Sequence, residues 1–462
     1  MSAPQVQVEP IALAPGALLA LASRWPGRYP VLLDSAAQGA HSHFSMLAAL
    51  PRATLTMDAA GKLQGPHSTP SGGFMPALEQ LWKDAAQDAP ARPSQLPFAG
   101  GWIVYLGYEL AREIEPTLQP FWPAASLADG RPVACAMRVP AALLQDGQGG
   151  AFLVTEPTVT PAERAQILDD IRQVGDSFSH STEPSSSPPI QLVEEAPDAY
   201  LSRVRRAQEY IRAGDIYQAN LSRPWRATLP DNYSLTALYQ RLRTTNPAPF
   251  AALAQFGDFR ILSSSPERLL QIRGRRVDTR PIAGTHPRGK TEPDDRALAA
   301  ALIAHPKERA EHVMLIDLAR NDLGRVCVGG TVRVDEYMAV ETYAHVHHIV
   351  SNVTGELRPE VTPVQALRAV FPGGTITGVP KVRCMQIIAE LEAAPRGPYT
   401  GSLGYINHDG SADFNILIRT ISVLGRELEL RAGAGIVADS RPERELEESR
   451  AKARGMVLAL TP

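Results

Sequence analysis

The sequence has few cysteines and no excess of charge of one sign. Its three cysteines, Cys135, Cys327 and Cys384, are odd in number and far apart, which argues against both a disulfide framework and a cysteine metal site. The formal net charge is −3, so the composition does not point to nucleic acid. Sparse cysteine is typical of the reducing cytoplasm, where we expect this chain to work.

Long apolar runs are also missing. No stretch approaches the roughly 18 consecutive apolar residues that a membrane-spanning helix needs. The opening residues, MSAPQVQVEPIALAPG, lack the charged start and apolar run of a signal peptide. The 462 residues are 44% hydrophobic and 21% charged, which is enough apolar material for a large core.

A segment rich in serine, proline and acids divides the chain. Residues 178–198 read FSHSTEPSSSPPIQLVEEAPD and cannot bury enough apolar surface to order themselves. We therefore expect an N-terminal β-rich region over 1–178, a linker or loop over 179–198, and a C-terminal region over 199–462. The alternative is a surface loop within one compact body.

Both regions contain strand patterns, and helical periodicity is clearest in the C-terminal region. Predicted strands, which are β-branched runs bounded by glycine and proline, are 29–36, 100–110, 132–140, 150–156, 216–222, 250–257, 260–266, 340–357, 412–425 and 427–437. Helical periodicity predicts helices over 199–214, 307–324 and 441–460. Because strands and helices do not alternate one for one, we predict an α+β fold rather than a doubly wound sheet.

Two pairs of glutamates are the most informative polar feature. Glu308 and Glu311 lie three residues apart on one predicted helix, and Glu445 and Glu448 do so on another. Side chains at i and i+3 share a helix face, so two such faces could bring four carboxylates around one point. Hard oxygen ligands of this kind suit Mg²⁺. Solvated helix faces with i,i+4 pairs, such as Glu448 with Lys452, explain the same spacing.

Three glycine-rich segments could expose backbone to an anion. They read RPIAGTHPRG (280–289), FPGGTITGVPKVR (371–383) and AGAGIVADS (432–440). Backbone N–H groups and helix N-termini can hold a carboxylate, and small residues permit close approach. Plain turns or tight strand packing explain each segment taken singly.

Two further features concern an arginine and a histidine cluster. Arg419 lies inside the apolar run NILIRTI, and a buried arginine needs an anion, from a ligand or from an internal salt bridge. His345, His347 and His348 cluster in a predicted strand, where alternation puts the first two on one face and the third on the other. The usual spacing of zinc ligands is absent, so we expect a buried or substrate-facing histidine.

Taken together, these segments resemble the chorismate-utilising enzymes, which include anthranilate synthase component I, aminodeoxychorismate synthase component I, and isochorismate and salicylate synthases. The resemblance also extends to the N-terminal stretches YPVLLDS and FAGGWIVYLGYE. It implies an α+β sandwich of large antiparallel sheets with the active site in the C-terminal region. The matching C-terminal stretches, in family order, are GDIYQANLS (214–222), SSSPERLL (263–270), RPIAGTHPRG (280–289), KERAEHVMLIDLARNDLGRV (307–326), VHHIVS (346–351), FPGGTITGVPKVR (371–383), GSLGYI (401–406), DFNILIRT (413–420) and GAGIVADSRPERELEES (433–449).

The resemblance implies roles for individual residues. Glu267 would be the general acid that protonates the departing C4 hydroxyl, because hydroxide is a poor leaving group. His348 and Thr285 would also belong to the catalytic site. The residues implied to hold Mg²⁺ against the ring carboxylate of chorismate are Glu308, Glu311, Glu445 and Glu448. The residues implied to bind the rest of the substrate, beginning with the two that would grip the pyruvyl carboxylate, are Arg419, Tyr405, Lys381, Thr377, Gly433, Ala434 and Gly435.

Gln218 and the cysteines bear on the nucleophile. Isochorismate-forming relatives have a lysine at the position of Gln218 that activates water. A neutral amide cannot act as that base, so we expect ammonia as the nucleophile. A glutaminase has its nucleophilic cysteine in a G-x-C-x-G turn, and none of the three cysteines of this chain lies in such a turn: Cys135, Cys327 and Cys384. Ammonia should therefore come from a separate glutamine amidotransferase subunit.

Two aminations remain open. Ala283 is the third residue of the PIAGT motif, where many aminodeoxychorismate synthases have a nucleophilic lysine; alanine excludes that covalent route and is typical of anthranilate synthase. Asn220 in YQANLS and the stretch YPVLLDS resemble the aminodeoxychorismate branch more. We therefore predict 4-amino-4-deoxychorismate as the product, formed through non-covalent 2-amino-2-deoxyisochorismate, with anthranilate as the alternative.

Two further hypotheses are less specific. Ser35 lies where the family often has an N-terminal amino-acid pocket, although a serine at a strand end also satisfies backbone groups. A non-catalytic ligand-binding subunit is the alternative of another class. It would need defects at the acid or metal positions, and Glu267 and the four glutamates are all present.

Overall fold

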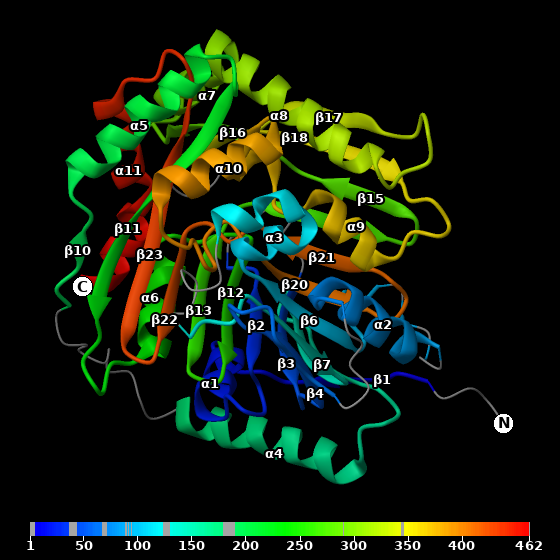
Figure 1. Cartoon of the computed structure of the whole chain (residues 1–462). Coiled ribbons are helices and arrows are strands. Elements are labelled where there is room, and N and C mark those ends of the chain that lie inside the picture. The colour runs from blue at the N-terminus through cyan, green and yellow to red at the C-terminus, as the bar shows by residue number, and fades with distance from the viewer. Residues whose placement is uncertain are drawn as a thin grey trace.

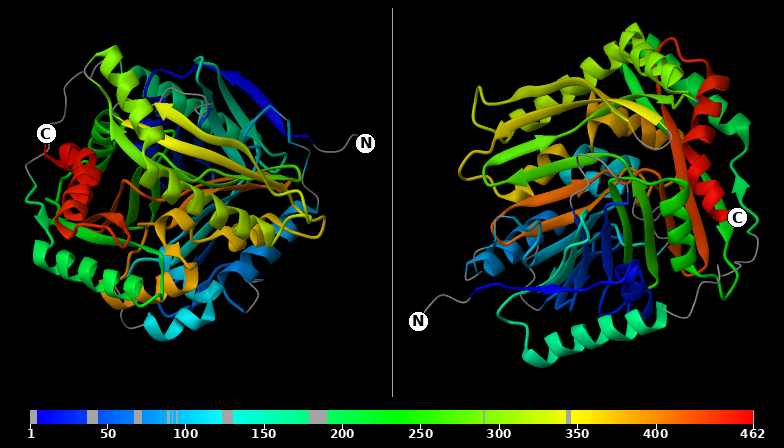
Figure 2. Two further views of the ribbon diagram at one scale, coloured as in Figure 1. Left: turned by 90° about the horizontal axis from the view of Figure 1, so that it is seen from above. Right: turned by 180° about the vertical axis from the view of Figure 1, so that it is seen from behind.

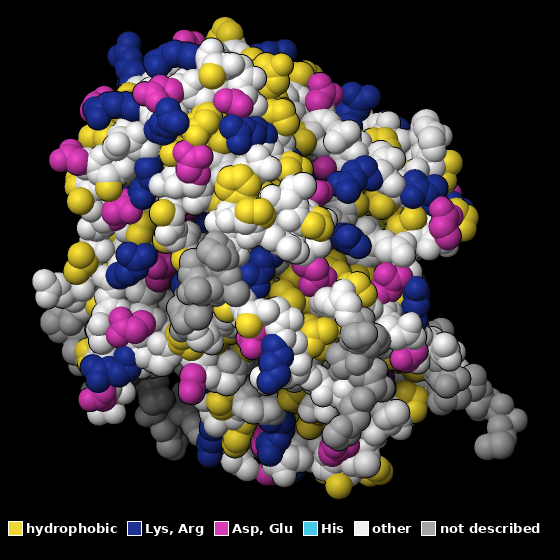
Figure 3. Space-filling view, viewed as in Figure 1, with side chains coloured by type: hydrophobic (Ala, Val, Ile, Leu, Met, Phe, Trp, Pro, Cys, Tyr) yellow, Lys and Arg dark blue, Asp and Glu magenta, His cyan; other side chains and the backbone are white. Residues whose placement is uncertain are grey.

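The computed structural model describes residues 5–36, 44–66, 72–87, 90, 92–93, 95–122, 130–178, 190–289, 291–342 and 346–461. Within these residues, no helix combines the length and the apolar character needed to cross a membrane. Acidic and basic side chains are interspersed over the face drawn in Figure 3.

The first of two large sheets is antiparallel and contains both chain regions. Among the described residues it has twelve strands, with β19 (Gly378–Val379) pairing β11 outside the main path. The main path is β1 (Gln7–Ile11), β9 (Ala151–Thr155), β8 (Ala141–Asp146), β3 (Phe44–Ala49), β2 (Val31–Asp34), β12 (Phe250–Phe256), β13 (Phe259–Ser265), β22 (Thr420–Leu424), β23 (Glu427–Ile436), β11 (Gln218–Thr228) and β10 (Val193–Glu194).

The second sheet is also antiparallel and crosses the first (Figure 1). It has eleven strands in the described part of the chain, with β17 (Arg333–Thr342) pairing β18 outside the main path. The main path is β16 (Ile282–Pro287), β18 (Val346–Glu356), β15 (Arg276–Thr279), β14 (Arg268–Arg273), β21 (Ala412–Asn415), β20 (Ser402–Asn407), β6 (Gly101–Leu106), β7 (Ala134–Val139), β4 (Ala53–Met57) and β5 (Leu63–Gln64).

Helices cover the outer faces of the two sheets (Figures 1 and 2). Helices α1, α4, α6 and α11 pack on the first sheet, and α2, α8, α9 and α10 contribute to the core of the second. The helices are α1 (Ala17–Arg24), α2 (Phe74–Ala86), α3 (Ala111–Ile114), α4 (Pro161–Phe178), α5 (Pro197–Arg212), α6 (Leu235–Thr245), α7 (Glu292–Ala304), α8 (Pro306–Gly324), α9 (Pro363–Val370), α10 (Lys381–Glu392) and α11 (Pro442–Leu460). The predicted α+β sandwich of antiparallel sheets is confirmed.

A third apolar core lies between the sheets. Val31 and Ile261 of the first sheet and Ile103 of the second are each fully buried in it. Alternation along each strand sends one row of side chains into this layer and the other row toward the helices. Each apolar strand therefore contributes side chains both to the core between the sheets and to a core under the helices.

The two chain regions share both sheets. Strand β2 pairs with β12 in the first sheet, and β6 pairs with β20 in the second. Of the predicted linker, residues 179–189 lie outside the described residues, whereas Val193–Glu194 form β10 beside β11. Strands from both sides of the segment are therefore hydrogen-bonded to one another.

Candidate active site

Glu267 and Arg419 lie at two of the points where the chain passes from one sheet to the other. Glu267 follows β13 of the first sheet and precedes β14 of the second, and Arg419 lies between β21 and β22. The two crossings are hydrogen-bonded to each other: Ser264 N donates to Arg419 O at 3.0 Å, and Ile416 N donates to Glu267 O at 3.0 Å. The sandwich thus fixes both side chains through backbone contacts.

The Glu267 carboxyl is buried and has an elevated pKa. Only 4% of the residue is exposed, and burial raises its pKa to about 7 because the charged form loses solvation. The Thr375 hydroxyl donates to Glu267 Oε1 at 2.8 Å, and this bond, together with the charges of Arg419 and Lys452, opposes the effect of burial. A carboxyl in this state can carry a proton near neutral pH.

Arg419 presents a cation in a strained backbone conformation. Its φ is +52°, a left-handed value that a non-glycine residue adopts at a cost. Its half-buried guanidinium has no hydrogen bond or ion pair to any residue in the described ranges. Burial lowers its pKa, while the nearby Tyr399, Glu267 and Glu448 oppose that change. Such a guanidinium is suited to a bidentate carboxylate from a ligand.

Tyr399, not Tyr405, is the tyrosine beside Arg419. The charges of Tyr399 and Arg419 influence each other's pKa. Tyr405 instead lies on β20 against Phe98, and its charged neighbours are led by Asp413 and Arg268. The expectation for Tyr405 was wrong, because β20 begins only at Ser402 and its alternation turns Tyr405 toward another cavity.

His348 lies on β18 beside the Gly-containing strand β16. Its Nδ1 is 3.4 Å from the Gly284 carbonyl oxygen, and only 4% of the residue is exposed. Burial, followed by the charges of Arg419 and Lys452, lowers its pKa to about 4. The imidazole is therefore neutral at physiological pH. Thr285 pairs with His348 through the backbone of β16, but its side chain lies outside the described part of the structure, as does all of His345.

Gln218 and Glu311 meet at a glycine of β23. A Cβ on Gly435 would lie 2.3 Å from Gln218 Nε2 and 3.6 Å from Glu311 Oε1. The Gln218 amide oxygen is buried and has no hydrogen-bond partner among the described residues. Gly435 therefore provides the space in which this amide sits between two neighbouring strands.

Glu308 and Ala283 lie at the glycine-rich segment 280–289. A Cβ on Gly284 would lie 2.9 Å from Glu308 Oε2, and the φ of Gly284 is +63°. Ala283 is half-buried on β16 and pairs with Ile349. Gly284 thus separates Glu308 on one side from His348, whose ring faces its carbonyl, on the other.

The four predicted metal ligands lie on two helices, Glu308 and Glu311 on α8 and Glu445 and Glu448 on α11. Among the described residues, no three acidic, histidine or cysteine side chains are close enough together to hold an ion. Glu445 is buried, whereas the Glu448 side chain is 48% exposed and pairs with Lys452 at 2.7 Å. Carboxylate oxygens nevertheless match what Mg²⁺ prefers. The four-carboxylate Mg²⁺ site stays a prediction, with its two pairs of carboxylates on α8 and α11.

Lys452 is a site residue that sequence reasoning treated only as the i,i+4 partner of Glu448. Its Nζ donates to the Gly433 carbonyl at 3.1 Å. Its charge lowers the pKa of both Glu267 and His348. Lys452 therefore lies near both groups, and it adds a second cation to that of Arg419.

Four residues that were predicted to contact the substrate make contacts within the chain. Lys381 pairs with Asp322 at 2.5 Å, and the Thr377 hydroxyl donates to the Gly373 carbonyl at 3.0 Å. Ala434 is fully buried in the core, and a Cβ on Gly433 would meet Leu221 O at 2.0 Å. The substrate roles of these four residues stay predictions. Thr375, two residues before Thr377, is the threonine whose hydroxyl contacts Glu267.

Ser35 lines a different space. Its backbone N–H donates to Ser45 Oγ at 3.1 Å. It lies with Asp34, Arg268 and Tyr405 around a cavity of about 440 Å³. The amino-acid ligand suggested for this position stays a prediction.

Tyr399, Thr375 and Lys452 were missed although each lies within or beside a quoted motif. Thr375 belongs to FPGGTITG, Tyr399 precedes GSLGYI by one residue, and Lys452 is four residues after Glu448. No periodicity distinguishes Thr375 from Thr377 inside a short turn. A lysine four residues after a glutamate is also the ordinary pattern of a solvated helix.

Comparisons with known proteins point to one enzyme family. Residues 31–458 match the family described as chorismate binding enzyme. Anthranilate synthase component 1 of Thermus thermophilus is 40% identical over 449 residues, covering 96% of this chain and 94% of that protein. Aminodeoxychorismate synthase component 1 of Bacillus subtilis is 50% identical over 267 residues, covering 57% of this chain and 56% of that protein.

A solved structure has a similar fold over most of the chain. Anthranilate synthase component I from Streptococcus pneumoniae TIGR4 matches with a TM-score of 0.76 and 31% identity. The match covers 91% of this chain and 93% of that one. The similarity thus includes strands from both chain regions.

Proposed function

This chain belongs to the chorismate-binding enzyme family, and from that membership we propose that it aminates chorismate to 4-amino-4-deoxychorismate. The choice of ammonia rests on Gln218, whose neutral amide cannot deprotonate water. Its buried amide oxygen, beside Gly435 and Glu311, is an acceptor without a partner in the described part of the chain. An N–H donor such as ammonia suits that acceptor.

Glu267 would supply the proton for the departing hydroxyl. The C4–O bond breaks as the Glu267 proton moves to that oxygen, so the leaving group is water. The pKa of about 7 supports this role, because the acid is then protonated near neutral pH and still acidic enough to transfer its proton. The Thr375 hydroxyl would hold the carboxyl in one orientation.

Arg419 and Lys452 would bind the anionic substrate. Arg419 has a fork of donors suited to a carboxylate, and Tyr399 beside it adds a phenolic donor. Lys452 adds a second positive charge near Glu267. Cations around a buried acid also favour a substrate that carries two carboxylates.

Mg²⁺ is the proposed cofactor, and Glu308, Glu311, Glu445 and Glu448 are its proposed holders. Bound Mg²⁺ would neutralise and polarise a substrate carboxylate. Binding of Mn²⁺, followed by electron paramagnetic resonance without substrate turnover, tests these residues separately from activity. We expect the pair variant Glu311→Gln/Glu448→Gln to weaken Mn²⁺ binding at least about tenfold; unchanged binding would remove the glutamates as ligands.

Two ammonia molecules would be used in sequence. The first forms a bond to C2 while the protonated C4 hydroxyl leaves, which gives 2-amino-2-deoxyisochorismate. The second forms a bond to C4 and gives up a proton, while the C2 amine takes up a proton and leaves as ammonia. Ala283 has no nucleophilic atom, so neither step would pass through a covalent bond to that position.

A separate glutamine amidotransferase subunit is the proposed ammonia source. Cys135, Cys327 and Cys384 are all buried and free. Burial raises their pKa values to about 12, 11 and 12, respectively, so none of the three supplies a thiolate for glutamine hydrolysis.

Anthranilate synthase component I is the second candidate. The similarity to the Thermus thermophilus protein spans nearly the whole chain, and Ala283 is compatible with either amination. In that case the first amination would be followed by elimination of pyruvate, and no second ammonia would be used.

Identification of the aminated product decides between these candidates. The purified chain would be incubated with chorismate, Mg²⁺ and an ammonium salt, with and without an added aminodeoxychorismate lyase. Lyase-dependent 4-aminobenzoate, with no anthranilate fluorescence, is the expected result. Lyase-independent anthranilate would establish the second candidate. Failure to consume chorismate would contradict both and favour a non-catalytic binding subunit.

A further inference from the structure

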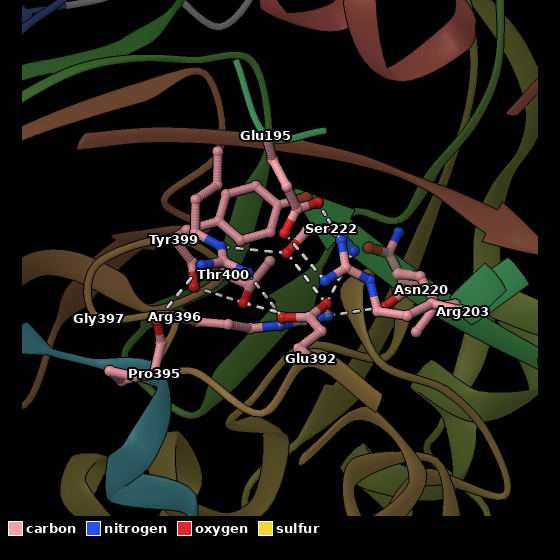
Figure 4. Close-up of polar contacts among 12 residues, drawn as sticks. Glu195, Arg203, Asn220, Ser222, Glu392, Pro395, Arg396, Gly397, Tyr399 and Thr400 are labelled. Carbon is pink, nitrogen blue, oxygen red and sulfur yellow. Dashed lines mark hydrogen bonds and ion pairs between the residues drawn. The ribbon is translucent and has the colours of Figure 1, made fainter. Parts of the chain in front are cut away.

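A buried charge network lies behind the site, where Glu392 at the end of α10 is shared by two arginines. Arg396 Nη2 lies 2.7 Å from Glu392 Oε1, and Arg431 Nη2 lies 3.0 Å from Oε2. The Ser222 backbone N–H also donates to Glu392 Oε1 at 2.7 Å. Figure 4 shows Glu392 next to Arg396 and Ser222. The three charged side chains are each at most 2% exposed.

Arg396 reaches beyond Glu392 to three different segments. Its Nη1 donates to the Ile376 carbonyl at 3.2 Å and to the Thr400 hydroxyl at 3.3 Å, and its Nη2 donates to the Asn220 carbonyl at 2.7 Å. Figure 4 shows Asn220 and Thr400 around this guanidinium. One side chain therefore connects a turn, a strand and a loop that are far apart in the sequence.

Each of these segments carries a site residue. Ile376 follows Thr375, the hydroxyl donor to Glu267. Asn220 lies two residues after Gln218 on β11, and their side chains share a face of the strand.

The third segment leads to the carboxylate-binding cation. Thr400 follows Tyr399, and the Thr400 N–H donates to Leu417 O at 2.8 Å, two residues before Arg419. The guanidinium of Arg396 thus contacts the segments that carry Thr375, Gln218 and Tyr399.

We propose that Arg396 is the positioning residue that sets these three parts of the site relative to one another. The proposal rests on the proposed function, because it assigns Arg396 to the same amination. Arg396 touches no reacting atom. It acts through the Ile376 and Asn220 carbonyls and the Thr400 hydroxyl.

Arg396 is held in place both at its guanidinium, by Glu392, and at its backbone, by Glu109. Glu392 is ionised, since the surrounding arginines lower its pKa to about 2 in spite of its burial. The Glu109 carboxylate, from the turn after β6, accepts the backbone N–H groups of Arg396 at 2.6 Å and Gly397 at 3.1 Å. A planar guanidinium that is paired with an ionised carboxylate and carried on a fixed backbone can serve several acceptors in set directions, which a lysine ammonium cannot do.

Arg431 offers a matched control. It has the same charge, the same carboxylate partner and the same burial. It donates instead to the Ser222 hydroxyl and the Pro395 carbonyl, at 3.2 and 3.4 Å. Arg431→Lys therefore disturbs the same ion network without removing the contacts to Ile376, Asn220 and Thr400.

The first test compares Arg396→Lys with Arg431→Lys in the full chain. Both should lower the melting temperature by similar amounts. Arg396→Lys should lower kcat/KM for chorismate at least about tenfold, because misplacing reacting groups by about 1 Å can cost about a hundredfold. Arg431→Lys should stay within about threefold of wild type. Equal losses in the two variants would overturn the proposal, whereas an inactive wild type would instead contradict the proposed function.

The second test uses a readout that a purely structural role does not move. If Arg396 holds the Thr375 turn, Arg396→Lys weakens the bond from Thr375 to Glu267 and raises the pKa of Glu267. The alkaline limb of kcat/KM then moves to higher pH in Arg396→Lys and in Thr375→Val, but not in Arg431→Lys. In the double variant Thr375→Val/Arg396→Lys the limb should move no further than in Thr375→Val alone. Additive movement would contradict the proposal.

If Arg396→Lys does not fold, a milder variant still tests the proposal. Thr400→Val keeps the shape of the side chain and removes the hydroxyl that Arg396 contacts. Thr400 follows Tyr399 and is hydrogen-bonded through its backbone near Arg419. KM for chorismate should therefore rise at least about threefold, with little change in melting temperature. An unchanged KM would contradict the proposal.

Discussion

Glu267 and Glu392 show how surroundings decide the state of a carboxyl. Both are buried, with 4% and 6% of each residue exposed. The pKa of Glu392 is lowered to about 2 because Arg396 and Arg431 contact it directly. The pKa of Glu267 is raised to about 7 because burial penalises its charged form, and its nearby cations, Arg419 and Lys452, form no direct ion pair with it within the described residues. Only Glu267 is left with a proton to give near neutral pH.

This difference predicts the pH dependence of turnover. A general acid must be protonated, so kcat/KM should fall as pH rises through about 7, the pKa of Glu267 in the free enzyme. Free ammonia must be held constant across the series, because its own protonation also changes with pH. Glu267→Gln should abolish turnover while chorismate binding, measured by calorimetry, survives. Near-wild-type turnover of Glu267→Gln would remove this residue as the acid.

At the same scale, the sequence located some side chains and misplaced others for a physical reason. Glu267 and Arg419 stand out because a charged residue inside an apolar run needs a partner or a task. Tyr405 was confused with Tyr399 because two tyrosines six residues apart look alike until the start of a strand fixes which face each occupies. Lysines are equally ambiguous, since Lys381 pairs internally and Lys452 was expected only as a surface partner.

At the scale of elements, β23 has a glycine, Gly435, at the point where a side chain would displace Gln218 of the neighbouring strand β11. Gly435 pairs with Asn220 across β23 and β11, and a Cβ there would come within 2.3 Å of Gln218 Nε2. That nitrogen is the end of a flexible side chain, so the amide would have to turn away while the strands stay paired. The strand pair therefore tolerates the change better than the site does.

Gly435→Ala should consequently impair ammonia use more than folding. We expect kcat/KM for ammonia to fall at least about tenfold, because the displaced Gln218 amide no longer faces the site, while the melting temperature changes by only a few degrees. Gly214→Ala is the control, since its Cβ would meet nothing within 4 Å; its left-handed φ of +81° can lower stability but leaves the site untouched. Equal ammonia kinetics in both variants would show that Gln218 does not face the nucleophile.

The periodicity of the sequence predicted three of the described helices and roughly half of the described strands, and it missed a turn at the candidate site. Helix 307–324 was confirmed to end at Gly324, and strand 427–437 was confirmed as β23 within one residue. The single strand expected over 412–425 is in fact β21 and β22, separated by Ile416–Arg419. An apolar run reads as continuous, whereas the left-handed turn at Arg419 is visible only in the backbone. Helix α7 was missed, since its alanine-rich face gives little periodic contrast.

At the scale of the whole molecule, the chain regions are joined by pairing that no local pattern reveals. Sequence reasoning identified antiparallel sheets but not which strands are neighbours, because partners such as β2 and β12 lie more than 200 residues apart. The four carboxylates illustrate the same limit. Helical spacing predicts each pair, but the relative position of α8 and α11 depends on both sheets. The donor types were predictable, and the distance between the pairs was not.

The shared sheets lead to a prediction about unfolding. Removing residues 1–178 would strip β2 from β12 and β6 from β20, and would expose long unpaired edges in both sheets. The two regions should therefore unfold together. Four of the five tryptophans lie in the first region: Trp25, Trp82, Trp102 and Trp122. In a Trp225→Phe variant, fluorescence reports on that region alone, whereas circular dichroism reports on the whole chain.

In urea, the fluorescence and circular dichroism midpoints of the Trp225→Phe variant should coincide, as in a single cooperative transition. The wild type, measured in parallel, controls for any loss of stability from replacing the buried Trp225. An earlier fluorescence transition would mean that the first region unfolds independently, despite its hydrogen bonds to β12 and β20. Glu267 lies where the chain passes between these sheets, and Arg396 is tied through Glu109 to the turn after β6. Chorismate turnover should therefore be lost at the same urea concentration as the fluorescence and circular dichroism signals, because the site needs the strand pairing between the two regions.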